Sequence, residues 1–254
     1  MHRGAITTDK MVLRLGWMYP DLLNLHGERG SVQAFQRAGE NLGVEVQVRR
    51  IDDFDETIPF AELDLCLFLP GELKTLGFLK PALEKQRKAL EAYLERGGYA
   101  VAVGTTGALF GGRVTREDGS TWDGLGLLEM TSEERRYVWG DDIHFRLNDS
   151  KQEIFGSQIQ MLDVHAADPL GQTIYGRGND GSGAEGARCR NLLYTNCLGP
   201  VFVKNPWWTE ALVKDICLQK LGVVQKRPNT LESRSFDSCL RFTASKPPFD
   251  GKIR

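Results

Sequence analysis

The chain has 254 residues, of which 41% are hydrophobic and 26% charged, a composition typical of a globular protein that can bury a substantial core. Its net charge of −2 provides no bulk attraction to nucleic acid or to anionic membranes, and no apolar run approaches the roughly 18 residues that a membrane span needs. The sequence therefore predicts neither a nucleic-acid partner nor a membrane span.

Cysteine usage and the first residues indicate the compartment. The five cysteines show no CxxC spacing, and Cys66 lies in an apolar run that favours a buried, inert thiol. Residues 1–11 are mixed and polar, unlike a secretory signal, and we interpret them as a leader. We expect a cytoplasmic protein.

The first hundred residues alternate between strand and helix patterns. Continuous apolar runs mark buried strands, and apolar residues at helical spacing mark helices. The expected elements are a strand at Val12–Met18, a helix at 31–42 with Ser31 as its N-cap, strands at 44–48 and 63–69, and a helix at 80–96. This alternation predicts a doubly wound α/β sheet, with functional sites at the carboxyl ends of its strands.

Residues 97–112 have the pattern of a nucleophile elbow. Gly97 and Gly98 lead into a short apolar run, a Gly-rich turn follows it, and apolar residues then resume. A strand–turn–helix of this kind lifts one side chain above the edge of the sheet. The tip falls at Gly104 or Thr105, and neither is the Cys or Ser that such a turn usually presents.

The sequence beyond residue 113 is rich in strand patterns. Antiparallel strands are predicted at 137–147, 153–164 and 173–175, a further strand at 192–197, and a final helix after Pro206. The Gly-rich residues 176–186 lack a Gly-Lys-Ser/Thr signature, so we predict a hairpin loop there and not a phosphate-binding loop. Residues 223–254 contain three prolines and few aliphatic residues, and we predict a poorly ordered tail.

Four stretches together resemble one family. They are residues 19–30 (Tyr-Pro-Asp-Leu-Leu-Asn-Leu-His-Gly-Glu-Arg-Gly), 97–111, 176–186 and 193–206. In these stretches the sequence is similar to class I glutamine amidotransferases of the cobyric acid synthase type. It is most similar to the glutaminase subunit of lipid II isoglutaminyl synthase, which pairs with a Mur-ligase-like subunit. The resemblance covers residues 12–222 and implies one domain with a flavodoxin-like, mostly parallel sheet flanked by helices, plus an antiparallel extension.

The resemblance also implies a lost catalytic pair. In the family a cysteine thiolate attacks the glutamine amide, a histidine acts as base and then acid, and backbone N–H groups hold the oxyanion. Counting along the matched segments places the nucleophile on Gly104 and the histidine on Leu198, where the family's Thr-Tyr-Leu-His-Gly-Pro reads Thr-Asn-Cys-Leu-Gly-Pro. On the oxyanion side, Pro70 has no N–H to donate.

Other residues near the elbow have competing interpretations. A nucleophile at Thr105 or Thr106 needs an adjacent base, so we expect both hydroxyls to cap the following helix. Cys197 neighbours the lost histidine position, and we expect it to be buried by packing. The resemblance places the substrate pocket at Pro70, Gly71, Glu72, Thr105 and Thr106.

The histidines do not indicate a metal site. A tetrahedral site needs three or four ligands, and His26, His144 and His165 have no paired spacing. We expect neither a metal nor another cofactor.

The leading functional hypothesis is a catalytically degenerate glutaminase-like subunit. By resemblance, it binds a Mur-ligase-like synthetase and supports amidation of a peptidoglycan precursor, lipid II. Two alternatives remain open: an active glutaminase or amidotransferase that uses non-standard residues, and a sensor whose emptied pocket still binds glutamine or another amide.

Overall fold

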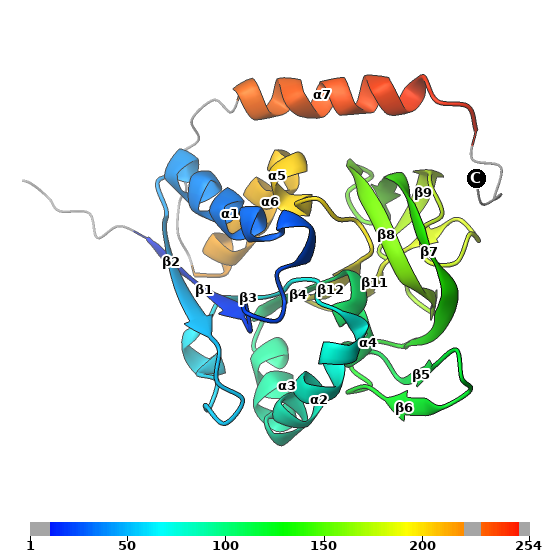
Figure 1. Cartoon of the computed structure of the whole chain (residues 1–254). Helices are drawn as coiled ribbons and strands as arrows, with labels where there is room; N and C mark the ends of the chain where they lie inside the picture. Colours follow the sequence, from blue (N-terminus) through cyan, green and yellow to red (C-terminus); the bar gives the residue numbers. More distant parts are fainter. Residues whose placement is uncertain (1–10, 221–229, 249–254) are drawn as a thin grey trace, which may run out of the picture.

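A mostly parallel, six-stranded sheet organises the fold. The computed structural model describes residues 11–220 and 230–248 (Figure 1). The strands of this sheet run in the order β11-β12-β4-β3-β1-β2. They are β1 (Val12–Met18), β2 (Glu45–Ile51), β3 (Leu65–Phe68), β4 (Tyr99–Val103), β11 (Ala187–Cys189) and β12 (Leu192–Thr195). All neighbours are parallel except β11 and β12, as strand–helix alternation predicts.

A second sheet forms the antiparallel extension. Its order is β10-β9-β7-β5-β6, and β8 pairs with β7 off this path. The strands are β5 (Arg113–Thr115), β6 (Thr121–Asp123), β7 (Met130–Leu147), β8 (Glu153–Ala166), β9 (Gly171–Tyr175) and β10 (Ala184–Glu185). The three antiparallel strands predicted for this region correspond to β7, β8 and β9, with wider bounds. Residues 176–183 of the Gly-rich segment connect β9 to β10, and these two strands pair as a hairpin.

Helices cover both faces of the parallel sheet. They are α1 (Arg29–Leu42), α2 (Leu76–Lys85), α3 (Arg87–Glu95), α4 (Gly107–Phe110), α5 (Val201–Lys204), α6 (Pro206–Gln219) and α7 (Thr230–Ala244). Figure 1 shows α1, α5 and α6 on one side of the sheet and α2 and α3 on the other. Among the residues that the structure describes, no helix is long and apolar enough to cross a membrane.

The alternation of side chains along β4 divides the core into two layers. Ala100 and Ala102 pack with the α2 and α3 side of the core. Val101 and Val103 pack with the side formed by α1 and α6. Successive residues of a strand point to opposite faces, so a strand covered by helices on both faces is apolar throughout, as β3 and β4 are.

Two helices differ from their predicted form. The helix predicted at 80–96 is two helices, α2 and α3, which meet at Gln86. The Gln86 side chain accepts a hydrogen bond from the Ile58 N–H at 2.7 Å and donates one to the Glu56 carbonyl at 3.0 Å. These contacts hold the chain at the break. Ser31 is not the N-cap of α1, which begins at Arg29; its hydroxyl instead donates to the Glu28 carboxylate at 2.8 Å.

Helix α7 corrects the prediction of a poorly ordered tail. Residues 230–244 are helical, while residues 221–229 and 249–254 lie outside the described residues. α7 lies across α5, α6, β7 and β8 (Figure 1). Glu232 of α7 reaches Arg37 of α1 at 3.6 Å, and Lys246 pairs with Asp141 and Asp142 of β7. Contacts with the rest of the fold therefore hold a segment that has few aliphatic residues of its own.

A substitution at Gly107, the first residue of α4, tests how closely this helix packs on the sheet. A Cβ at this position would lie 2.2 Å from Cε2 of Tyr194, a fully buried ring whose hydroxyl donates to Asn196 at 2.6 Å. Gly107→Ala should therefore lower the free energy of unfolding by about 1–3 kcal/mol, measured by urea denaturation.

The matched control is Gly77→Ala in α2. A Cβ at Gly77 meets nothing within 4 Å, so alanine should leave stability unchanged or raise it by up to about 1 kcal/mol through its higher helix propensity. Equal effects of the two substitutions would contradict the close approach of α4 to β12.

Candidate functional site

The predicted elbow lies at the carboxyl end of an interior strand. β4 ends at Val103, a 3-10 turn follows at Gly104–Thr106 (η4), and α4 begins at Gly107. Gly104 has φ +63°, a left-handed conformation that glycine adopts without a Cβ penalty. Gly104 thus lies at the tip of the turn between β4 and α4.

Gly104 and Leu198 are brought together across the sheet edge. A Cβ on Gly104 would lie 3.2 Å from Cδ2 of Leu198 and 3.1 Å from Cβ of Pro70. β12 runs beside β4, and the backbone of Leu198 exchanges hydrogen bonds of 2.7 and 3.0 Å with Ser157 of β8. These contacts hold Leu198 beside Gly104.

A pocket of about 380 Å³ opens at this contact. It includes four of the five predicted pocket residues, Pro70, Gly71, Glu72 and Thr105, together with Gly104 and Leu198. The remaining lining residues are Leu25, His26, Leu73, Lys74, Arg116, Glu134, Val138, Ile159 and Met161. The turn carrying His26 and the β7–β8 pair thus form walls that the elbow motif alone did not predict.

The two threonines of the elbow have different roles. Thr106 is fully buried and does not line the pocket, which corrects its predicted place there. Its hydroxyl accepts from the Val103 N–H at 3.1 Å and donates to the carbonyl of Phe68 or Val103. It therefore secures the turn between β4 and α4. The Thr105 hydroxyl does not cap the helix but bonds to the backbone of Gly71.

Cys197 is buried beside the pocket wall. Its side chain is fully enclosed, and a Cβ on Gly156 would lie 2.2 Å from its sulfur. Burial raises the pKa of the Cys197 thiol well above its ordinary value, and the nearby carboxylates of Glu185 and Glu28 raise it further. A buried neutral thiol is a poor nucleophile, and Cys197 does not line the pocket.

The three histidines lie in separate settings. His144 bonds to Glu153 at 3.0 Å and His165 to Asp180 at 3.1 Å. His26 lines the pocket from the turn at Leu25–Gly27 (η1), where partial burial lowers the pKa of its imidazole. Across residues 11–220 and 230–248, no group of three or more His, Cys, Asp or Glu side chains could hold a metal ion.

Sequence reasoning missed Glu28, whose carboxylate joins two walls of the pocket. It accepts hydrogen bonds from the Gly199 N–H at 2.6 Å, the Val201 N–H at 3.3 Å and the Ser31 hydroxyl. Burial raises the pKa of Glu28, and these donors together with the charge of Lys204 oppose that rise. The only sequence signal was a charged residue inside the 19–30 motif.

A second buried network fixes the Gly-rich loop. Glu185 is fully buried and accepts from the Thr195 hydroxyl and the Asn196 N–H, both at 2.7 Å. Asn179 accepts from the Gly186 N–H at 2.7 Å and from Asn196 Nδ2 at 3.0 Å. The loop therefore supports the strand that leads to Leu198, and its polar groups are used internally.

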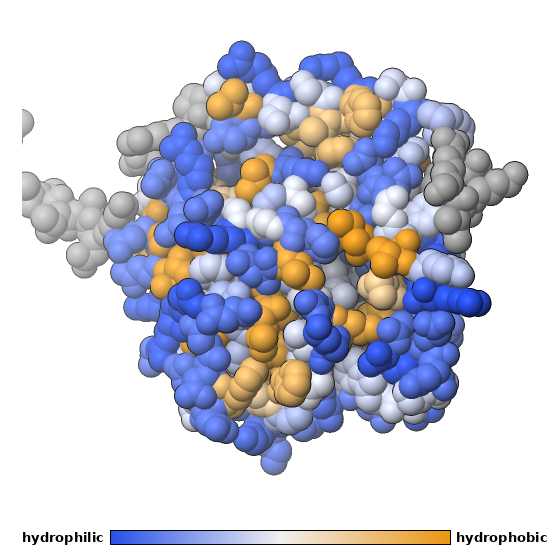
Figure 2. Space-filling view, in the orientation of Figure 1, coloured by the Kyte–Doolittle hydropathy of each residue, from blue (hydrophilic) through white to orange (hydrophobic). Residues whose placement is uncertain are grey.

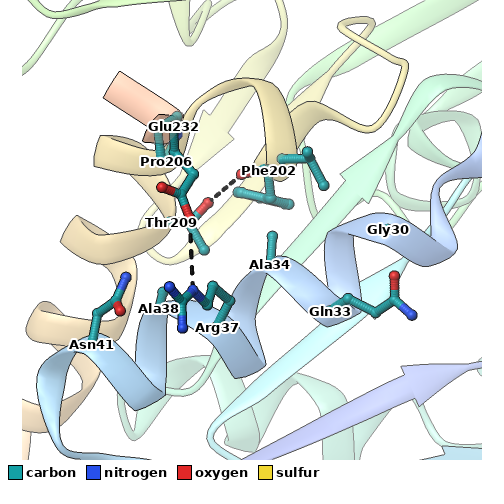
Figure 3. A pocket seen from close by; sticks show the side chains of 11 residues that line it. Gly30, Gln33, Ala34, Arg37, Ala38, Asn41, Phe202, Pro206, Thr209 and Glu232 are labelled. Carbon is teal, nitrogen blue, oxygen red and sulfur yellow. Dashed lines mark hydrogen bonds and ion pairs between the residues drawn. The ribbon is translucent and has the colours of Figure 1, made fainter. Parts of the chain in front are cut away.

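A smaller pocket of about 230 Å³ lies beneath α7 (Figure 3). It is bounded by α1, α5 and α6, and the ion pair between Arg37 and Glu232 crosses it. The Thr209 hydroxyl at its edge donates to the Phe202 carbonyl at 2.7 Å. This groove contains none of the elbow residues.

Two curated relatives match most of the chain. A subunit of lipid II isoglutaminyl synthase (glutamine-hydrolyzing), GatD of Streptococcus pneumoniae, is 24% identical over 220 residues, covering 83% of this chain and 82% of the relative. GatD of Staphylococcus aureus is 26% identical over 206 residues, covering 79% and 82%. The resemblance to the glutaminase subunit is confirmed. No protein-family model matches the chain.

Solved structures give the same fold. A crystal structure of a glutamine amidotransferase superposes with a TM-score of 0.51 at 11% identity, covering 80% of this chain and 98% of the other. PurLQS from Thermotoga maritima superposes with a TM-score of 0.50 at 14% identity, covering 84% and 100%. The predicted amidotransferase-like fold class is therefore confirmed.

Removing the Glu28 carboxylate should loosen the junction that it holds. In Glu28→Ala the N–H groups of Gly199 and Val201 lose their acceptor, and each buried unsatisfied group costs about 1–3 kcal/mol. We expect a loss of roughly 2–5 kcal/mol in urea denaturation at pH 7. Glu40→Ala, at a side chain that is 68% exposed on the same helix, is the control and should cost less than about 0.5 kcal/mol. Similar losses in the two variants would contradict the role of Glu28.

The raised pKa of Glu28 predicts the direction in which folding stability changes with pH. Folded Glu28 keeps its proton to a higher pH than the unfolded chain, so this contribution to stability is complete below its usual pKa of 4.5 and is lost as the pH rises through the raised value. Glu28→Gln cannot titrate. The stability of wild type relative to Glu28→Gln should thus decrease from pH 4.5 upward, and a constant difference would refute the assignment.

Proposed function

We propose that this chain is a catalytically degenerate glutaminase-like subunit of a lipid II-amidating enzyme. The observation that carries the proposal is the contact between Gly104 and Leu198 at the elbow, where glutamine hydrolysis requires a thiol beside an imidazole. The similarity to GatD subunits over most of the chain supports the pathway.

The remaining groups at the elbow do not rebuild the missing chemistry. Glycine has no nucleophile, and leucine can neither accept nor donate a proton. Loss of the nucleophile or its base costs on the order of 10⁴–10⁶ in turnover in triad enzymes. The Thr105 hydroxyl is directed to the Gly71 carbonyl at 2.6 Å, so it lacks the base contact that would activate it.

The names of the two relatives support a synthetase partner. The printed names describe subunits of a glutamine-hydrolyzing lipid II isoglutaminyl synthase. We infer that this chain binds a Mur-ligase-like synthetase subunit in the cytoplasm and supports its amidation of lipid II, with no cofactor of its own. In this role the retained scaffold is a binding partner and the elbow supplies no ammonia.

The first test is glutamate release by the purified wild-type protein. We expect no release from L-glutamine above the rate of a buffer blank, measured by an enzyme-coupled glutamate assay. Release that disappears in Thr105→Ala or Cys197→Ala would overturn the degenerate assignment and identify the residue responsible.

The second test restores the two groups. Gly104→Cys alone should stay inactive, because a thiol beside Leu198 keeps a pKa of roughly 8.5 or higher and its Cβ is crowded by Pro70 and Leu198. Gly104→Cys with Leu198→His should release glutamate slowly, above either single variant and only at a large excess of glutamine, because Pro70 leaves the oxyanion side without an N–H. An active Gly104→Cys single variant would show that another residue serves as the base.

The third test concerns the partner. Coexpression with the Mur-ligase-like synthetase of the same organism should yield a complex that elutes as one species in size-exclusion chromatography. Separate elution of the two chains at micromolar concentration would remove the partner from the proposal and leave the loss of catalysis standing.

A further inference from the structure

One hydroxyl occupies both hydrogen-bonding groups of Gly71 beside the elbow. The Thr105 hydroxyl donates to the Gly71 carbonyl at 2.6 Å, and the Gly71 N–H points back to the Thr105 oxygen at 3.3 Å. Gly71 lies in the turn after β3, and both residues line the elbow pocket. The turn after β3 and the turn after β4 are thus connected by a reciprocal pair of bonds.

This pair uses a backbone donor that lies beside the elbow. Backbone N–H groups that face an elbow hold the oxygen of an amide or of its tetrahedral adduct. Pro70 has no N–H, and the Gly71 N–H is already directed to Thr105. An amide oxygen that approaches the Gly71 N–H must therefore displace this intramolecular bond.

The charged groups of the pocket are also paired internally. Arg116 bonds to Glu134 through Nε and Nη2, and Lys74 pairs with Glu72 at 2.6 Å. Apart from the His26 imidazole, the side chains between these pairs are mostly apolar. Val138 and Ile159 of β7 and β8 are 54% and 41% exposed, and Figure 2 shows hydrophobic surface gathered over β8. The pocket thus offers an entering amide few unpaired polar groups.

We propose that Thr105 is a specificity-determining residue that excludes the side-chain amide of glutamine from the elbow pocket. The inference rests on the proposed function, since it concerns the same site in its degenerate state. It goes further by assigning the exclusion to one hydroxyl: the protein has lost not only the reacting groups but also the open donor that would retain the substrate. By the same argument a glutamine sensor is disfavoured.

Calorimetric titration of L-glutamine into the full chain tests this exclusion. Wild type and Thr105→Ser, which keeps the hydroxyl, should show no saturable binding up to about 10 mM L-glutamine. This upper concentration detects dissociation constants in the millimolar range. Thr105→Ala frees the Gly71 N–H and should show saturable binding with a dissociation constant of about 1 mM or less, at least tenfold below that upper concentration. Saturable binding by wild type, or no gain in Thr105→Ala, would overturn the proposal.

Hydrogen exchange at the Gly71 amide tests the bond itself and does not depend on ligand. In protein labelled with ¹⁵N-glycine, this amide should be protected in wild type and Thr105→Ser and should exchange at least tenfold faster in Thr105→Ala and in Thr105→Val, which keeps the side-chain volume. The other glycine resonances report whether each variant is folded. Equal protection in folded hydroxyl-free variants would refute the assignment.

The failures of the two proposals can be told apart. Glutamate release by wild type would refute the degenerate function and, because hydrolysis requires bound glutamine, the exclusion that rests on it. A Thr105→Ala variant that is folded and no better at binding would refute the exclusion while the loss of catalysis stands.

Discussion

The pocket depends on the buried carboxylate of Glu28. One turn carries Leu25 and His26, and another carries Leu198. The two turns are far apart in sequence, and no strand pairing joins them. Glu28 accepts from the N–H groups of Gly199 and Val201 and so joins them. A buried charge persists only when hydrogen bonds compensate its desolvation. Because the Glu28 carboxylate needs these N–H donors, it holds the two turns in a fixed relative position.

The contacts that hold the elbow do not depend on the reacting groups that we propose it has lost. The elbow is held by the Thr106 hydroxyl, by close packing of Gly107 on Tyr194, and by the pairing of β4 with β3 and β12. None of these contacts involves the side chain at position 104 or the polar character of position 198. Stability and catalysis therefore reside in different atoms of the same motif, and the second can be lost while the first is kept.

The sequence predicted those parts of the fold whose signals are local. β1 matches its predicted bounds, and β4 follows the predicted Gly pair, because buried parallel strands are continuous apolar runs. The break at Gln86 was not predictable, since it depends on Ile58, 28 positions away. α7 was missed for the same reason, as contacts with α5, α6, β7 and β8 replace aliphatic residues.

The candidate site divides in the same way. The positions of Gly104 and Leu198 followed from motif spacing, and their contact follows from neighbouring strands. The separate roles of Thr105 and Thr106 could not be predicted from the sequence. The two adjacent hydroxyls differ only in the carbonyl to which each one donates a hydrogen bond. The role of Glu28 could not be predicted from the sequence either, because its donors Gly199 and Val201 are 171 and 173 positions away.

The sparse packing of α7 implies that this helix detaches before the rest of the molecule unfolds. Of its side chains only Thr243 is buried, and its tie to α1 is an ion pair between half-exposed groups, which contributes little in water. Elements with so few buried contacts open at free energies well below that of global unfolding. Partial opening of this kind leaves both sheets intact while exposing the apolar groove between α1 and α6. We therefore expect a minor, partly opened species that exposes this groove and leaves the elbow undisturbed.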